Sequence, residues 1–172
     1  MARVGLSGRA KQRPSRPRRA LVGLSGFSEA DRDLLMRARD VRCHAYAPYS
    51  HFGVGAAVLT KSGAVHTGTN MENASYGLTL CAETSALLQS VAAGDFCVES
   101  IAIVGGPLDG GKGNGAVVTP CGRCRQLILE AAQVAAIDTR VLSSNSDLSK
   151  VLVFPISSLI PHAFGPKNLK RP

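Results

Sequence analysis

The sequence of 172 residues contains no tryptophan, and aromatic residues make up only 5% of it. It also lacks a long hydrophobic run, because Gly, Ser and charged residues interrupt every apolar stretch. A helix needs about 18 consecutive apolar residues to be a candidate for crossing a membrane, so we exclude a membrane protein. The chain has the length of one domain, and a folded chain of this size buries about 68–70% of the surface that it exposes when unfolded.

The N-terminus lacks a hydrophobic segment of the signal-peptide type. We therefore expect no export to an oxidising compartment, and the predicted location is the cytoplasm. In a reducing compartment cysteines serve as free thiols or metal ligands rather than as disulfide partners. The chain has an odd number of them: Cys43, Cys81, Cys97, Cys121 and Cys124.

Acidic residues are absent from residues 1–20, which hold seven of the 20 Lys and Arg. The formal net charge of +8 therefore comes almost entirely from this segment. Its low apolar content and two prolines predict a disordered basic arm over residues 1–26, followed by one domain over residues 27–172. We interpret the arm as a solvated tail, with nucleic-acid binding and organelle targeting as alternatives.

Hydrophobic spacing and turn residues predict an α/β fold with the element order α-β-β-α-β-α-β-β. The first helix is expected to begin after Ser28, whose side chain is suited to an N-cap. The full set comprises helices at about 28–44, 81–92 and 122–132, strands at 53–60, 64–69, 98–104, 140–142 and 151–154, a glycine-rich loop at 105–116 and a helical turn at 156–160. This order predicts a three-layer α-β-α sandwich around one mixed five-stranded sheet.

Three of the cysteines stand at two predicted helix starts. Cys81 begins one helix, and Cys121 and Cys124 form a Pro-Cys-x-x-Cys motif at the start of the next. Helix N-termini favour thiolates, and Zn²⁺ prefers a tetrahedron of sulfur and nitrogen ligands. The pattern predicts one zinc ion per subunit with an open fourth position. A closed structural zinc site and a redox Cys-x-x-Cys pair are the alternatives.

Glu83 stands two residues after Cys81. A carboxylate beside an open zinc position can take a proton from zinc-bound water and return it to the substrate. We therefore predict that Glu83 is catalytic. The alternative is an acid that is merely favoured by the positive end of the helix dipole.

These motifs resemble those of the zinc-dependent cytidine deaminases of the small homotetrameric type. Cys-Ala-Glu at 81–83 and Pro-Cys-x-x-Cys at 120–124 correspond to the zinc-deaminase signature. The likeness extends over about residues 28–169 and includes segments 47–52, 70–74 and 163–166. It implies deamination of cytidine and 2′-deoxycytidine to the uridines by a zinc-bound hydroxide, with Glu83 as the proton shuttle, in pyrimidine salvage.

The resemblance also implies which residues bind the substrate in a homotetramer. Asn70 and Glu72 match the pair that binds the ribose hydroxyl, and Phe52 matches an aromatic residue that packs against the pyrimidine. Ala82 also belongs to the implied substrate-binding set. The residues that would reach the pocket of a neighbouring subunit are Ala74, Tyr76 and Phe164.

One position departs from the family pattern. Thr84 stands where the family commonly has an arginine that donates hydrogen bonds to the zinc thiolates. Three thiolates leave a Zn²⁺ site with a net charge of −1, which weakens the effect of the metal on water. Arg123, Arg125 and the two helix N-termini are the candidates for offsetting this charge. We predict that Arg125, which belongs to the family motif, donates to the thiolates.

Three other functions share some of these features. A blasticidin S-type aminonucleoside deaminase has the same zinc motifs, but Glu72 and the Phe-Gly-Pro at 164–166 favour a cytidine deaminase. A polynucleotide deaminase mostly has histidine at the position of Cys81, and residues 21–160 carry a net charge of −2, which offers no groove for phosphates. A zinc-stabilised nucleic-acid-binding module would leave Glu83 without a role.

Overall fold

The computed structural model of the chain describes residues 18–109 and 115–169. Its centre is a six-stranded sheet in the order β1-β6-β5-β4-β2-β3. The neighbours β4 and β5 run parallel, and the other pairs are antiparallel. The strands are β1 (Arg18–Val22), β2 (Phe52–Thr60), β3 (Val65–Thr69), β4 (Val98–Pro107), β5 (Arg140–Asn145) and β6 (Lys150–Pro155).

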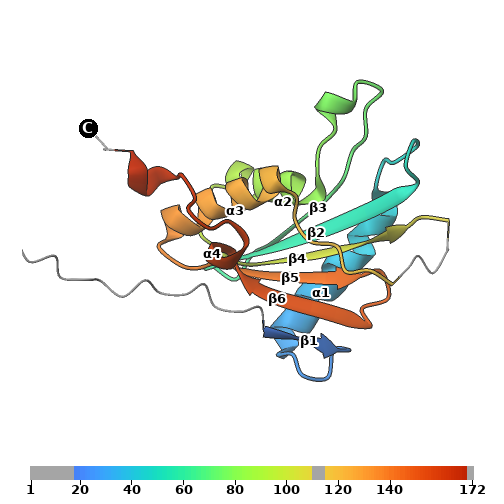
Figure 1. Ribbon diagram of the computed structural model, residues 1–172, viewed down its shortest axis with the longest axis horizontal. Helices are drawn as coiled ribbons and strands as arrows, with labels where there is room; N and C mark the ends of the chain where they lie inside the picture. The colour runs from blue at the N-terminus through green and yellow to red at the C-terminus, as the bar shows by residue number, and fades with distance from the viewer. Residues whose placement is uncertain (1–17, 110–114, 170–172) are drawn as a thin grey trace, which may run out of the picture.

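The helices lie on both faces of this sheet, as Figure 1 shows. Helix α1 covers one face, and α2 and α3 lie side by side on the other. The bounds are α1 (Glu29–Val41), α2 (Ala82–Ala92), α3 (Gly122–Ala135) and α4 (Ile156–Leu159), with short 3₁₀ helices at Arg42–His44, Tyr76–Leu78 and Pro166–Asn168. The predicted three-layer sandwich is confirmed.

Alternating side chains of the strands supply two separate cores. In β2, Ala57 packs toward α1, while Ala56 and Val58 pack toward α2 and α3. In β4, Ala102 and Ile103 divide between the two faces in the same way. Successive residues of a strand point to opposite faces, so a strand that is buried on both sides reads as a continuous apolar run.

One part of the predicted disordered arm is a strand. Residues Arg18–Val22 form β1, which pairs antiparallel with β6 at the edge of the sheet. The five expected strands are therefore joined by a sixth. A composition averaged over residues 1–26 hides the short apolar run Ala-Leu-Val at 20–22, which is enough to continue a sheet. Residues 23–26 form a turn after β1, in which Leu24 packs against the core under α1. Residues 1–17 of the expected arm lie outside the described residues.

The close packing of α2 against the sheet depends on a glycine. A Cβ atom at Gly68 of β3 would collide with the backbone nitrogen of Ala86 in α2. Helix and strand can approach this closely only because Gly68 has no side chain. This contact sets how closely α2, which begins directly after Cys81, can lie against the sheet. Among the described residues, no helix is long and apolar enough to cross a membrane.

Candidate metal and substrate site

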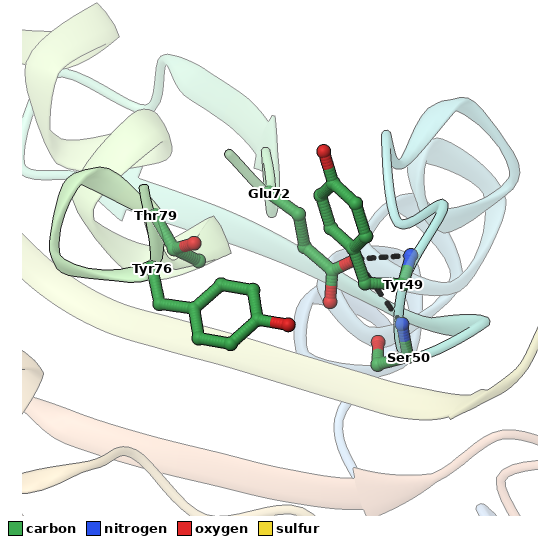
Figure 2. A pocket seen from close by; sticks show the side chains of 5 residues that line it. All are labelled: Tyr49, Ser50, Glu72, Tyr76 and Thr79. Atoms are coloured by element: carbon green, nitrogen blue, oxygen red, sulfur yellow. Dashed lines mark hydrogen bonds between the residues drawn. The ribbon is translucent and has the colours of Figure 1, made fainter. Parts of the chain in front are cut away.

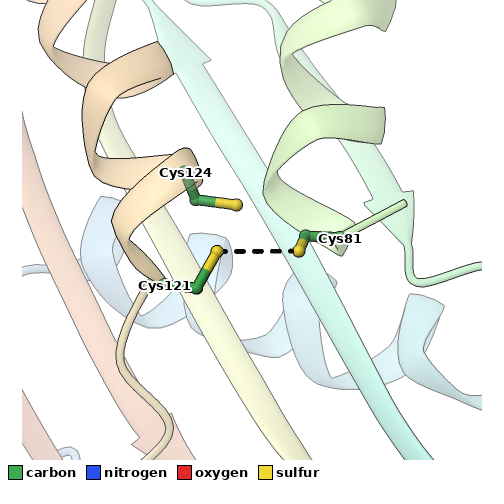
Figure 3. A group of neighbouring side chains, drawn as sticks. All are labelled: Cys81, Cys121 and Cys124. Atoms are coloured by element: carbon green, nitrogen blue, oxygen red, sulfur yellow. Dashed lines mark hydrogen bonds between the residues drawn. The ribbon is translucent and has the colours of Figure 1, made fainter. Parts of the chain in front are cut away.

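Three sulfur atoms meet where α2 and α3 begin. Cys81 is the N-cap of α2, Cys121 is the N-cap of α3, and Cys124 lies in the first turn of α3. Their Sγ atoms all lie within 4.8 Å of one another, and Cys81 Sγ is 3.8 Å from Cys121 Sγ (Figure 3). A tetrahedral zinc ion with Zn–S bonds of about 2.3 Å needs sulfurs about 3.8 Å apart. The donor set therefore fits one zinc ion.

No fourth ligand joins the three cysteines within the described part of the chain: no other Cys, His, Asp or Glu lies in the cluster. The closed structural zinc site considered from the sequence would need such a ligand. A tetrahedral ion at this place thus keeps one position for water or substrate.

Hydrogen bonding between the thiols shifts their pKa values in opposite directions. The hydrogen bond with Cys124 lowers the pKa of the Cys81 thiol to about 6, against the opposing effect of partial burial. The same contact, together with burial, raises the pKa of the Cys124 thiol. A divalent cation removes this conflict, because its charge stabilises all three thiolates at once.

Glu83 lies in the first turn of α2, two residues after Cys81. Its side chain is buried, with the residue only 4% exposed. Burial raises the pKa of its carboxyl group, and the nearby charge of Cys81 adds to the effect. An acidic side chain whose only role is to interact with the helix dipole does not need to be buried, so the burial of Glu83 argues against that alternative. A buried carboxyl group with a raised pKa is suited instead to taking up a proton and releasing it again.

Asn70 follows β3 and ties the neighbouring strand in place. Its Oδ1 atom accepts a hydrogen bond of 2.8 Å from the backbone nitrogen of Val54, and its Nδ2 donates to the carbonyl of Phe52 at 3.0 Å. Next along the chain, Met71 pairs with Leu80, the residue before Cys81. The segment that carries Asn70 and Glu72 is thereby attached to the metal site.

The carboxylate of Glu72 is held by backbone donors. Its Oε2 atom accepts hydrogen bonds from the nitrogens of Tyr49 and Ser50, at 2.9 and 3.2 Å (Figure 2). Hydrogen bonding from the Ser50 side chain and from the Tyr49 backbone holds the pKa of Glu72 below its usual range. Both backbone bonds go to Oε2. Oε1 takes part in neither backbone bond.

A cavity of about 390 Å³ opens beside Glu72. Figure 2 shows the residues that line it: Tyr49, Ser50, Glu72, Tyr76 and Thr79. The rings of Tyr49 and Tyr76 meet edge to face, with centroids 6.1 Å apart. Sequence reasoning did not assign a role to Tyr49 or Thr79. Tyr49 had a signal, since it lies in the segment 47–52 that carries the family resemblance, whereas Thr79 belongs to none of the matching motifs.

The remaining predicted substrate-binding residues differ in their exposure to solvent. Phe52 is partly exposed at the start of β2, and its ring and the side chain of Val118 both cover Gly105. Ala82 is fully buried in the core under α2. Ala74, Tyr76 and Phe164 are exposed in the single chain, the latter two by 76% and 63%.

Contrary to the prediction, the side chain of Arg125 donates hydrogen bonds to backbone carbonyls and not to the sulfurs. Its Nε atom donates to the carbonyl of Pro120 at 2.8 Å, and its Nη1 donates to the carbonyl of Leu159 at 3.1 Å. Long side chains in a helix point back toward its N-terminus, which brings this guanidinium to the turn before Cys121. Arg125 therefore holds the Pro120–Cys121 turn against α4.

Comparison with known proteins identifies the relatives of this chain. Residues 28–138 match the family described as the cytidine and deoxycytidylate deaminase zinc-binding region. A cytidine deaminase of Halalkalibacterium halodurans is 41% identical over 142 residues, which cover 81% of this chain and 98% of the relative. One of Mycobacterium tuberculosis is 41% identical over 128 residues, covering 74% of this chain and 84% of the relative.

Solved structures of cytidine deaminases also resemble this chain. The crystal structure of a cytidine deaminase from Burkholderia pseudomallei superposes with a TM-score of 0.68 at 38% identity. The match covers 80% of this chain and all of that one. A structure of the cytidine deaminase from Mycobacterium tuberculosis gives a TM-score of 0.63 at 35% identity, over 81% of this chain and 99% of that one.

Proposed function

This chain belongs to the cytidine deaminase family, and we propose on that basis that its site hydrolyses cytidine and 2′-deoxycytidine to the corresponding uridines. The chain is thus a zinc-dependent hydrolase. The observation that carries the proposal is the meeting of three sulfurs and the buried Glu83 at the starts of α2 and α3. Cys81, Cys121 and Cys124 would hold the ion, which supplies an acidified water molecule when bound.

Glu83 is the proposed proton shuttle. Its carboxylate takes one proton from the water and delivers it to N3 of the pyrimidine, while the water oxygen forms a bond to C4. The carboxylate then takes the remaining proton from the new hydroxyl group at C4 and passes it to the amino group at C4. The C4–N bond breaks, ammonia leaves, and the oxygen remains as the new carbonyl. Burial favours this role, because it raises the pKa of Glu83 and so makes the carboxylate a stronger base.

The sugar is the proposed ligand of Glu72 and Asn70. An ionised carboxylate accepts hydrogen bonds only, so Oε1 of Glu72 is suited to a ribose hydroxyl that donates. The backbone bonds to Oε2 fix the carboxylate before the substrate arrives. A site with a fixed acceptor discriminates against analogues that lack the hydroxyl it binds, so that hydroxyl must be one that cytidine and 2′-deoxycytidine share. Phe52 would pack against the pyrimidine.

We further propose a homotetramer in which Ala74, Tyr76 and Phe164 contact the pocket of a neighbouring subunit. Their exposure in the single chain supports this, because large aromatic side chains gain most from burial at an interface. Sedimentation of the full chain should give the mass of four subunits. A monomer with full activity would contradict the proposal.

We propose the cytoplasm as the place of the reaction, in the recycling of pyrimidine nucleosides. All three cysteines must stay reduced to bind a metal, and the cytoplasm keeps thiols reduced.

The decisive experiment measures ammonia release from cytidine. The zinc-loaded protein should release it, and a chelator should stop the reaction. Replacing Glu83 by Gln should lower kcat by about 10²–10⁴-fold, the usual contribution of a general acid–base group. Glu29→Gln is the matched control, since Glu29 is an exposed acid in the first turn of α1. Equal loss in both variants, or no release by the zinc-loaded protein, would refute the assignment.

A further inference from the structure

Thr84 contacts the metal site from the helix that carries Glu83. It lies in the first turn of α2 and is only 6% exposed. Its Oγ1 atom is 3.9 Å from Cys124 Sγ, a distance within reach of a hydrogen bond to the large sulfur atom. A buried hydroxyl group needs a hydrogen-bond partner, and for Thr84 the structure supplies this sulfur.

The three sulfurs differ in their access to water. Cys121 is exposed, Cys81 is intermediate, and Cys124 is fully buried. Water can donate hydrogen bonds to an exposed thiolate, but the thiolate of Cys124 must find its donors in the protein. A hydrogen bond to a buried ion is worth more than one in solvent, so a donor has its largest effect at Cys124.

Metal binding sets the direction of this contact. Without a metal, either the hydroxyl or the thiol can be the donor. A cysteine that binds zinc has lost its proton and can only accept. We propose that Thr84 is a positioning residue of the zinc site: its hydroxyl donates to the Cys124 thiolate and takes up part of the excess negative charge. This inference rests on the proposed zinc site.

The contact fills the role that the sequence assigned to Arg125. That guanidinium is engaged by the carbonyls of Pro120 and Leu159. A neutral hydroxyl donates one hydrogen bond and adds no charge, so the thiolates stay stronger electron donors than beside an arginine. Thr84 should therefore set both the affinity for zinc and the electron donation of Cys124.

The test compares Thr84→Val, which removes the hydroxyl and keeps the shape, with Thr84→Ser, which keeps the hydroxyl. Zinc affinity is measured by competition with a chromophoric chelator. Replacing zinc by Co²⁺ gives sulfur-to-cobalt charge-transfer bands, whose energy falls when a thiolate loses a hydrogen bond. Ser90→Ala is the matched control, because Ser90 is buried in α2 and its hydroxyl donates to the carbonyl of Leu87.

We expect Thr84→Val to weaken zinc binding about 10-fold or more and to shift the cobalt bands to longer wavelength. Thr84→Ser and Ser90→Ala should match the wild type in both readings. Wild-type affinity and bands for Thr84→Val, equal weakening by Thr84→Ser, or weakening without a band shift would each overturn the inference. If Thr84→Val does not fold, Thr84→Ala replaces it under the same criteria. A wild-type chain that takes up no zinc would instead refute the proposed site itself.

Discussion

The side chains that we propose to bind the sugar, Asn70 and Glu72, also hold the backbone that positions them. Asn70 uses both ends of its amide on β2, at Val54 and Phe52. Glu72 fixes the Tyr49–Ser50 turn through Oε2, and Oε1 takes part in neither backbone bond. A substitution at Asn70 therefore changes the site and the strand together. Glu72 offers the cleaner test, because glutamine can keep the backbone bonds.

Replacing Glu72 by Gln should weaken recognition of the sugar. Glutamine can turn its carbonyl oxygen toward the nitrogens of Tyr49 and Ser50, which then places an NH₂ group where the ribose hydroxyl must donate. Loss of a hydrogen bond to a charged acceptor costs about 1.5–3 kcal/mol, so kcat/KM for cytidine should fall roughly 10- to 150-fold. Steady-state kinetics measure this, with Glu99→Gln on the exposed surface of β4 as control.

The pH range of that contact follows from the environment of Glu72. Donors from Ser50 and Tyr49 hold the pKa of its carboxyl group below the usual range. The charged form is therefore the one present at neutral pH, and it is lost only as the pH falls through this lowered pKa. A Glu72→Gln variant with unchanged kcat/KM would show that the carboxylate does not contact the sugar.

At the scale of elements, much of the fold could be predicted from local signals. Ser28 caps α1 as expected, since its Oγ atom accepts from the nitrogen of Asp31 at 3.1 Å. The glycines at 105 and 106 misled the prediction: they were assigned to a loop, yet they continue β4 beside β2 and β5. A Cβ at Gly105 would collide with Val118, and one at Gly106 with Ser146. Such crowding arises from distant segments, so no local pattern reveals it.

In the site, too, some features could be predicted from local sequence and others depend on distant segments. The three cysteines and Glu83 could be predicted because their spacing within two helix starts is itself the chemical signal. The partners of Arg125 could not, because they lie on the turn at Pro120 and on α4, and the sequence does not say which way a long side chain turns. The contact of Thr84 with Cys124 likewise depends on how α2 and α3 sit against each other.

The closeness of α2 to the sheet leads to a prediction at Gly68. Gly68→Ala places a methyl group against the backbone of Ala86, so α2 must move away from β3. Overpacking of this kind costs about 1–3 kcal/mol of the free energy of unfolding. Because Cys81 and Glu83 move with α2, zinc affinity should fall as well.

Denaturant unfolding and chelator competition measure these two effects. Gly77→Ala is the control, since a Cβ there meets open space and its backbone is not in the left-handed region. A Gly68→Ala variant as stable as this control, with unchanged zinc affinity, would show that α2 is free to adjust.

At the scale of the whole molecule, the excess of positive charge and the proposed site belong to different parts of the chain. Residues 1–20 hold seven of the Lys and Arg, whereas every proposed site residue lies between Phe52 and Phe164. The net charge of +8 therefore says little about the substrate, which is an uncharged nucleoside in our proposal. The separation between the basic N-terminal segment and the domain is not complete, because β1 brings residues 18–22 into the sheet.

Two shortened chains separate these contributions. A chain beginning at residue 18 keeps β1 and every proposed site residue, so its activity and melting temperature should equal those of the full chain. A chain beginning at residue 26 loses β1 and also Leu24, which packs against the core under α1. It exposes the edge of β6 to pairing with other molecules. We expect it to melt at a lower temperature and to aggregate, as followed by calorimetry and light scattering. Identical melting of the two shortened chains would show that β1 adds nothing to the stability of the sheet, and a loss of activity already at residue 18 would assign a role to the segment before it.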